Sequence, residues 1–244
     1  MEVHHHAHTS RKKWTHYFWE FLMLFLAVFC GFLAEYQLEH KIEKDREKQY
    51  IYNLLEDLRA DTAIYAGSAR HNLTVFGLID TLIKLMKNPE RKNHVGKLAF
   101  TARMILPAWK EVFPADHTYE DMKSSGHLRL IRKRKVADNI SYYYNSASEL
   151  RKYNEAAMIW GTNYGSTMGK IFDGELLLKI LKEKKEQEAS PSDLLTEDRV
   201  VFNELITSAQ YLYGAIKLGE NVCSKRNLAA QNLIELIKKE YHLK

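Results

Sequence analysis

Residues 21–34 read FLMLFLAVFCGFLA, and this stretch decides the architecture of the chain. Between Tyr17 and Ala34 the only charged side chain is Glu20. Eighteen helical residues rise about 27 Å, close to the roughly 30 Å hydrocarbon core of a bilayer. The pattern therefore predicts a transmembrane helix over residues 17–34. We mark this membrane span by Tyr17, Trp19, Phe21, Phe25, Phe29, Gly31 and Ala34.

A cleaved signal peptide or a buried core helix could also contain such an apolar stretch. A signal peptide needs small residues at its cleavage site, whereas residues 31–40 read GFLAEYQLEH, with bulky and acidic side chains. A core helix of a soluble protein usually keeps a polar face, which residues 21–34 lack. Trp14, Tyr17 and Trp19 also form an aromatic cluster of the kind found at membrane interfaces. An uncleaved anchor is the interpretation that we favour.

Basic residues flank the span on both sides, so its orientation is the weaker part of the prediction. The nearer cluster is Arg11–Lys13, and the basic residues that follow the span lie within 41–48. Because a long domain can cross the membrane regardless of its charge, we expect a cytoplasmic tail over residues 1–16 and an exported, periplasmic body. This makes the chain a single-pass protein of the inner membrane. With Cys30 in the span and Cys223 far from it, no disulfide can be inferred.

The rest of the chain is predicted to be helical. Only 11 Gly and 4 Pro occur in 244 residues, too few for the many turns of an all-β protein. Residues 35–50 form a charged helical stalk, and from Ile51 apolar residues return at helical spacing. We therefore expect an all-α fold in which the transmembrane helix continues into the stalk and then into a helical bundle over residues 51–244.

Within the bundle the sequence predicts several helices and their ends. Expected helices cover Ser68–Lys87, ended by Asn88-Pro89, then Val95–Leu106 and Glu175–Glu188. From Glu197 the pattern predicts either one long helix or two collinear helices, with Gly219 as the candidate break between them. Residues 107–127 are predicted to be irregular, with a capping-box pattern at Thr118–Asp121 and a helix stop at Gly126. A heptad seam runs from Val136 to Met168, and small residues thin its middle, so a neighbouring helix or its bulky side chains must fill the gap.

The N-terminal sequence resembles one family in detail. It reads MEVHHHAH, then RKKW, then WEFLMLFLAVFCGFLAEYQLEH. These motifs resemble a group of single-span proteins of Bacteroidetes-type bacteria, which share the MEVHHH start, a Lys pair and a FLAV…GF.AE core. The resemblance covers residues 1–65, and residues 118–144 are similar to a motif of other anchored proteins of these bacteria. It implies an envelope protein with a helical soluble part and a native His-rich start, but no activity.

His4, His5, His6 and His8 are candidate metal ligands, because neutral imidazoles suit zinc, copper and nickel. Their spacing fixes no geometry, so a plain polar tail is the alternative that we favour. No cofactor is predicted anywhere in the chain.

A basic patch stands out in the bundle, formed by Arg129, Arg132, Lys133, Arg134 and Lys135. It could meet lipid phosphates or an acidic partner, although a solvated helix start is the interpretation that we favour. The chain carries 36 Lys+Arg against 31 Asp+Glu, which is not the field of a nucleic-acid binder. We expect no nucleic acid among its partners.

A ligand pocket is the second weak candidate, formed by Tyr143, Tyr153, Gly161 and Gly165. Close helix packing is the simpler interpretation of both glycines. Gly165–Lys170 fails the phosphate-loop pattern, and Ser124–His127 lacks the glycines of a nucleophile elbow. We therefore do not expect an enzyme.

These patterns favour a membrane-anchored interaction or scaffold protein of the bacterial envelope. The expected partners are the bilayer and an unknown membrane or periplasmic protein. Ala27 and Gly31 have the small-xxx-small spacing that also permits homo-oligomers without requiring them. The alternative is a sensor whose bundle binds a small ligand and signals through a partner protein.

Overall fold

The computed structural model describes residues 14–243, and within them the chain is all-α, as predicted. The long helices are α1 (Trp14–Lys87), α5 (Ala147–Ile171) and α7 (Arg199–Tyr241). Shorter helices are α2 (Val95–Ala108), α3 (His117–Ser124), α4 (Arg134–Asn145) and α6 (Gly174–Glu183), joined by the 3₁₀ turns η1 (Arg91–His94), η2 (His127–Leu130) and η3 (Pro191–Asp193). No strand forms among residues 14–243, where Phe172 and Leu194 make only an isolated bridge.

The chain divides into two compact units, Met1–Tyr50 and Ile51–Lys244. In the described part of the first unit, the apolar side chains of α1 are exposed, and Phe21 shows 64% of its surface. In the second unit, α1 turns a continuous row of apolar side chains inward. The row consists of Ile51, Leu54, Leu58, Tyr65, Val75, Ile79 and Leu82, each at most 3% exposed.

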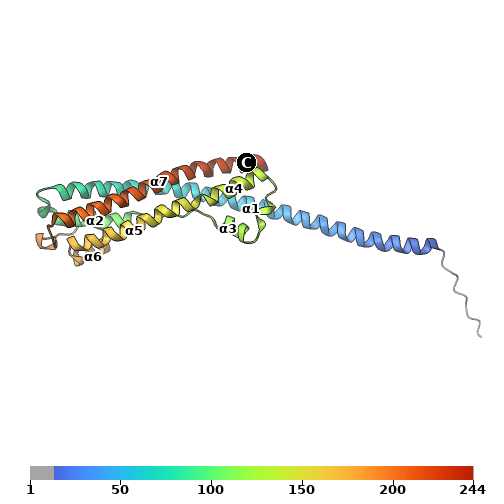
Figure 1. The fold of residues 1–244 in the computed structure, drawn as a ribbon, viewed down its shortest axis with the longest axis horizontal. Helices are drawn as coiled ribbons and strands as arrows, with labels where there is room; N and C mark the ends of the chain where they lie inside the picture. The colour runs from blue at the N-terminus through green and yellow to red at the C-terminus, as the bar shows by residue number, and fades with distance from the viewer. Residues whose placement is uncertain (1–13, 244) are drawn as a thin grey trace, which may run out of the picture. The chain divides into compact units, whose positions relative to one another are not determined.

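The second unit is a bundle in which α7 runs antiparallel to both α1 and α5 (Figure 1). On one side of α7, Tyr65 meets Arg226 and Phe76 meets Tyr213. On the other side, Trp160 meets Tyr211 and Lys170 meets Glu204. In both pairs of helices the residue numbers increase along one helix while those of their partners on α7 decrease. The helices of each pair are therefore antiparallel.

The predicted start of a separate helix at Ser68 is wrong, because α1 passes through Gly67 without a break. A glycine inside a helix costs about 1 kcal/mol relative to alanine. Core-facing Tyr65 and Val75 lie on either side of Gly67, and their burial holds one continuous helix. The helix ends at Lys87 as predicted, where the Asn88 side chain accepts a hydrogen bond from the Glu90 amide at 2.9 Å.

Gly219 does not break α7 either. A Cβ atom added at Gly219 would lie 3.4 Å from the Cβ of Tyr153 on α5, so this glycine lets the two helices approach closely. The thin middle of the heptad seam is filled by α2, whose Leu106 methyl groups lie 3.3 Å and 3.5 Å from the Cβ positions of Gly161 and Gly165. The seam itself divides at Ser146, between α4 and α5.

Other predicted helix boundaries also differ from the structure. The helix expected to end at Leu106 continues through Pro107 to Ala108. The helix expected to reach Glu188 ends at Glu183, because Lys184 adopts a left-handed conformation with φ of 54°. Residues 184–189 instead cross α2, where the Gln187 carbonyl lies over Gly96. The capping box at Thr118–Asp121 is also wrong, since α3 begins at His117 and shows no side-chain cap of its own. The stop at Gly126 is confirmed, with φ of 71°.

Candidate functional site

The apolar half of α1 is long and hydrophobic enough to cross a membrane. Its most apolar stretch of 18 residues has a mean hydropathy of 2.0, and none of that stretch is buried. It is the one candidate span among the described residues. Along one side, the rings of Phe21, Phe25 and Phe29 follow each other at 6.3 Å and 5.8 Å between centroids. These side chains cover each other in part, but no other helix covers them in residues 14–243.

Polar and aromatic side chains mark both ends of the candidate span. At the first end His16 Nε2 lies 3.0 Å from Glu20 Oε1, close to the aromatic cluster around Tyr17. At the other end the rings of Tyr36 and His40 pack edge to face at 4.3 Å. Tyr17 and Tyr36 are separated by roughly 28 Å of helix, which matches the hydrocarbon thickness of a bilayer. The spacing of these two tyrosines was a feature of the sequence that our prediction did not use.

The structure describes the predicted basic patch but not the predicted histidine cluster. His4, His5, His6 and His8 lie outside the described residues. The basic patch lies on η2, the loop after it and the first turn of α4, and Arg129, Arg132, Lys133, Arg134 and Lys135 are all exposed. Arg134 pairs with Asp138 one turn later at 3.8 Å, an exposed contact worth little stability. Residues 14–243 contain no group of three or more His, Cys, Asp or Glu side chains that could hold a metal.

The four residues of the predicted ligand pocket do not share a cavity. Leu106 occupies the space beside Gly161 and Gly165. Tyr153 borders a cavity of about 20 Å³ between α5 and α7, which is room for one water molecule. Tyr143 points elsewhere, into a buried polar network that the sequence patterns did not reveal. This network is the most unusual chemical feature of the bundle.

Asp61 and Arg226 are the charged members of the network, with only 0% and 4% of their surfaces exposed. The Tyr143 hydroxyl donates a hydrogen bond to Asp61 Oδ2, and the Ala115 amide donates to Asp61 Oδ1 at 2.6 Å. Asp61 therefore holds α4 and the segment before α3 against α1.

Arg226 of α7 makes the complementary set of contacts. Its Nε donates to the Tyr65 hydroxyl at 2.9 Å, and its Nη1 donates to the Tyr143 carbonyl at 2.9 Å and to Ser146 Oγ at 2.7 Å. The guanidinium carbon also lies 4.4 Å from the centroid of the Tyr143 ring. Arg226 thus joins α7 to α1 and to the junction at which α4 ends and α5 begins.

The electrostatics of the network favour a structural role. Burial raises the pKa of Tyr143, and the nearby Tyr65 and the hydrogen bond to Asp61 raise it further. Burial also raises the pKa of Asp61, against the opposing effects of the Tyr143 and Ala115 hydrogen bonds. Burial alone would lower the pKa of Arg226, but its interactions with Tyr65, including the hydrogen bond, leave it raised. Tyr143 stays protonated and donates its hydroxyl hydrogen to Asp61, and the Tyr65 hydroxyl accepts from Arg226, so both serve as hydrogen-bonding groups and not as bases or nucleophiles.

A sequence pattern could have pointed to both charged members of the network. Asp61 lies at helical spacing with Leu54, Leu58 and Tyr65, all of which face the core. A carboxylate in such a row is almost never buried without a partner. Arg226 lies at the same kind of spacing on α7, with Val222, Cys223 and Ala230, although its hydrogen-bond partners come from other segments.

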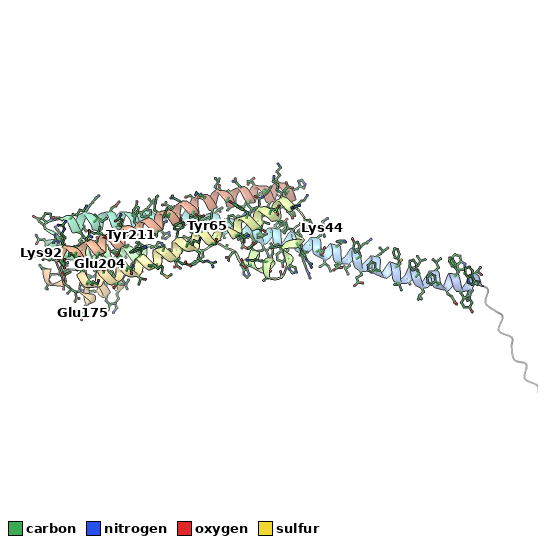
Figure 2. The ribbon with its side chains drawn as sticks, viewed as in Figure 1. Lys44, Tyr65, Lys92, Glu175, Glu204 and Tyr211 are labelled. Atoms are coloured by element: carbon green, nitrogen blue, oxygen red, sulfur yellow. The ribbon has the colours of Figure 1, made fainter. Side chains whose placement is uncertain are left out.

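The surface between α5 and α7 carries an exposed apolar stripe, which we call the α5/α7 stripe. Trp160 stacks on Tyr211 at 4.2 Å with an interplanar angle of 12°. Ile159 lies next to Trp160 and is 60% exposed, and Leu218 follows Tyr211 by two helical turns and is 50% exposed. Figure 2 shows Tyr211 between Glu204 and Tyr65 along the bundle. A stacked aromatic pair with exposed aliphatic neighbours is typical of contact surfaces.

The chain matches no family model, no curated protein and no solved structure. The geometry described above is therefore the basis for any function assigned to it.

Proposed function

We propose that the protein is a membrane-anchored helical interaction protein of the bacterial envelope, with a cytoplasmic N-terminus and a periplasmic bundle. The observation that carries this proposal is the contrast within α1. Its first part exposes a continuous apolar surface, and residues 51–87 of the same helix build the bundle core. Anchor and bundle thus share one helix.

The cost of leaving the apolar surface in water supports an anchor. Fully burying a Phe, Leu or Val side chain is worth about 1.5–3 kcal/mol. The exposed set includes Phe21, Leu24, Phe25, Leu26, Val28, Phe29, Phe32 and Leu33. An apolar surface of this size is stable only in an apolar medium such as a bilayer. Tyr17 and Tyr36, which are roughly one bilayer core apart, would then lie at the two membrane interfaces.

An interaction role fits the bundle better than catalysis. The buried tyrosines have raised pKa values and lie in a network closed to solvent. The α5/α7 stripe instead offers an exposed contact surface. Tethering this surface to a membrane would raise its local concentration near membrane partners, which is the mechanism that we propose.

Anchoring is tested by membrane extraction of the full chain. Wild type should stay in the pellet after an alkaline carbonate wash. The double variant Phe25→Arg/Phe29→Arg should move largely to the supernatant, because each arginine at the centre of a span costs about 2.5–3.5 kcal/mol. Phe113→Arg is the matched control, since Phe113 is 61% exposed on the bundle. Equal extraction of all three proteins would refute the anchor.

Orientation and interaction need separate tests. Alkaline phosphatase fused to the C-terminus should be active, whereas a fluorescent reporter that matures only in the cytoplasm should stay dark.

A photo-crosslinking residue at position 211 should give an adduct in intact membranes, and the same residue at the exposed neighbouring position 210 should not. An adduct of twice the chain mass would identify a homo-oligomer. No adduct at Tyr211, or equal adducts at both positions, would count against the stripe as the contact surface.

A further inference from the structure

A hollow of about 430 Å³ lies in the second unit, where α1 ends, η1 follows and α7 begins. Apolar side chains from two helices form one part of its lining, namely Met86, Phe202 and Ile206. Basic side chains from three segments form another part, namely Lys87, Arg91 and Arg199. In Figure 2 the label of Lys92, the neighbour of Arg91, marks this end of the bundle. The volume is within the range of small-molecule sites.

Arg91 is held in a defined position at this hollow. Its backbone amide donates to the Asn88 carbonyl at 3.2 Å, which fixes the turn after α1. Its guanidinium carbon lies 5.2 Å from the centroid of the Phe202 ring. Its Nε atom is withdrawn from solvent and has no hydrogen-bond partner among the described residues. A buried guanidinium nitrogen without an acceptor costs stability, and an anionic ligand would supply that acceptor.

The acidic side chains nearby are already engaged. Glu197 lines the hollow but forms an ion pair with Lys92. Asp198 caps α7 by accepting a hydrogen bond from the Val200 amide at 2.7 Å. The lining therefore keeps an excess of positive charge beside an apolar surface.

We propose that this hollow binds a small amphiphilic anion, a molecule with a carboxylate or similar acidic head and a compact apolar body. The head would pair with Arg91, with Lys87 and Arg199 adding to the attraction, and the body would lie against Phe202, Met86 and Ile206. This site is distinct from the membrane anchor and from the α5/α7 stripe, and it does not rest on either. It would give the bundle a ligand-dependent state in addition to its contact surface.

The test uses the full chain in nanodiscs of zwitterionic phosphatidylcholine, with empty nanodiscs as the blank. The probe is 6-fluoro-2-naphthoate, and its binding is followed by fluorine NMR relaxation. Two analogues test whether the acidic head is needed: the corresponding naphthol, which is uncharged, and the corresponding naphthylmethylamine, which is cationic. We expect the naphthoate to bind at least tenfold more tightly than either analogue, because only it can satisfy Arg91. Equal binding of all three, or no binding above the blank, would overturn the proposal.

Variants locate the site. Arg91→Gln keeps much of the side-chain length but removes the charge, and it should weaken naphthoate binding at least tenfold. Arg134→Gln is the control, since Arg134 is 94% exposed on α4 and does not line the hollow. If Arg91→Gln perturbs the near-UV circular dichroism spectrum, the exposed Arg199→Gln replaces it, with a loss of severalfold expected. Unchanged affinity in a folded variant of either residue would refute the site.

Discussion

The hydroxyl of Tyr143 on α4 donates a hydrogen bond to the carboxylate of Asp61 on α1, across 82 residues of sequence. Both side chains are nearly completely buried, and Arg226 of α7 contacts the same tyrosine from its other side. The contact therefore joins α1, α4 and α7 around one point in the bundle.

Removing the Tyr143 hydroxyl should destabilise the bundle. Tyr143→Phe keeps the ring over which Arg226 lies but leaves Asp61 Oδ2 without that donor. A buried acceptor that loses its partner costs about 1–3 kcal/mol. We expect a loss of this size in the free energy of unfolding, measured by urea titration in detergent micelles with near-UV circular dichroism. Tyr142→Phe is the control, because Tyr142 is 76% exposed on the same helix. Equal effects of both substitutions would show that the hydrogen bond is unimportant.

The free energy of unfolding of the bundle should also change with pH as Asp61 titrates. Burial raises the pKa of this carboxyl above its ordinary value of 3.8, so the folded protein takes up the proton more readily than the unfolded chain. The stability that this group contributes is thus fully present below its ordinary pKa and is lost as pH rises through the raised value. Asp61→Asn cannot lose a proton there. The free energy of unfolding of wild type, minus that of Asp61→Asn, should fall as the pH rises from the ordinary pKa of the carboxyl through its raised pKa in the folded protein.

The matched control for this titration is Asp138→Asn, because the Asp138 side chain is 71% exposed. Its difference from wild type should show no comparable fall over the same range. A wild-type advantage over Asp61→Asn that grows with pH would contradict the sign that we derive.

Gly96 should be intolerant of any side chain. A Cβ atom at this position would lie 2.1 Å from the Gln187 carbonyl oxygen, so α2 and residues 184–189 would have to separate. Gly96→Ala should lower the free energy of unfolding by about 1–3 kcal/mol through overpacking. Gly169→Ala should raise it by up to about 1 kcal/mol, since open space surrounds that helical position. Both variants can be compared by urea titration, and the same sign for both would refute this interpretation.

Cys223 should be unreactive in the folded protein. It is 3% exposed, and burial raises the pKa of its thiol, so little of the reactive thiolate forms. In a Cys30→Ser background, the reaction of Cys223 with an aromatic disulfide reagent should be slow until denaturant is added. Adding Leu228→Cys to this background should introduce a fast-reacting thiol, because Leu228 is 60% exposed on the same helix. Rapid reaction of Cys223 without denaturant would contradict the buried position.

The sequence predicted features that depend on local chemistry. The all-α class, the end of α1 before Pro89 and the left-handed Gly126 each follow from residues within one or two turns. The wrong boundaries depend on distant partners. The amide of Thr118, at the start of α3, donates to Asp57 of α1 at 3.1 Å, across 61 residues. The capping pattern depends on residues 118–121 alone, so it could not predict a contact with Asp57.

The candidate site was less predictable than the fold for the same reason. The spacing of Asp61 and Arg226 along their helices indicates that they face the core, but it does not identify the tyrosines that they contact there. Gly161 and Gly165 suggested a gap in the seam, and only the packing of α2 shows that Leu106 fills it. The apolar part of α1 needed no such partner, because composition and length alone mark it as a candidate span.

The order of synthesis gives the antiparallel pairing of α1 and α7 a practical consequence. Tyr65 leaves the ribosome 161 residues before Arg226, the side chain that it finally contacts. At ordinary bacterial translation speeds this is a wait of roughly ten to thirty seconds. During that interval the part of α1 that α7 finally covers lacks its partner helix. A premature stop codon before α7 would leave this part of α1 uncovered, so we expect such truncated products to be degraded.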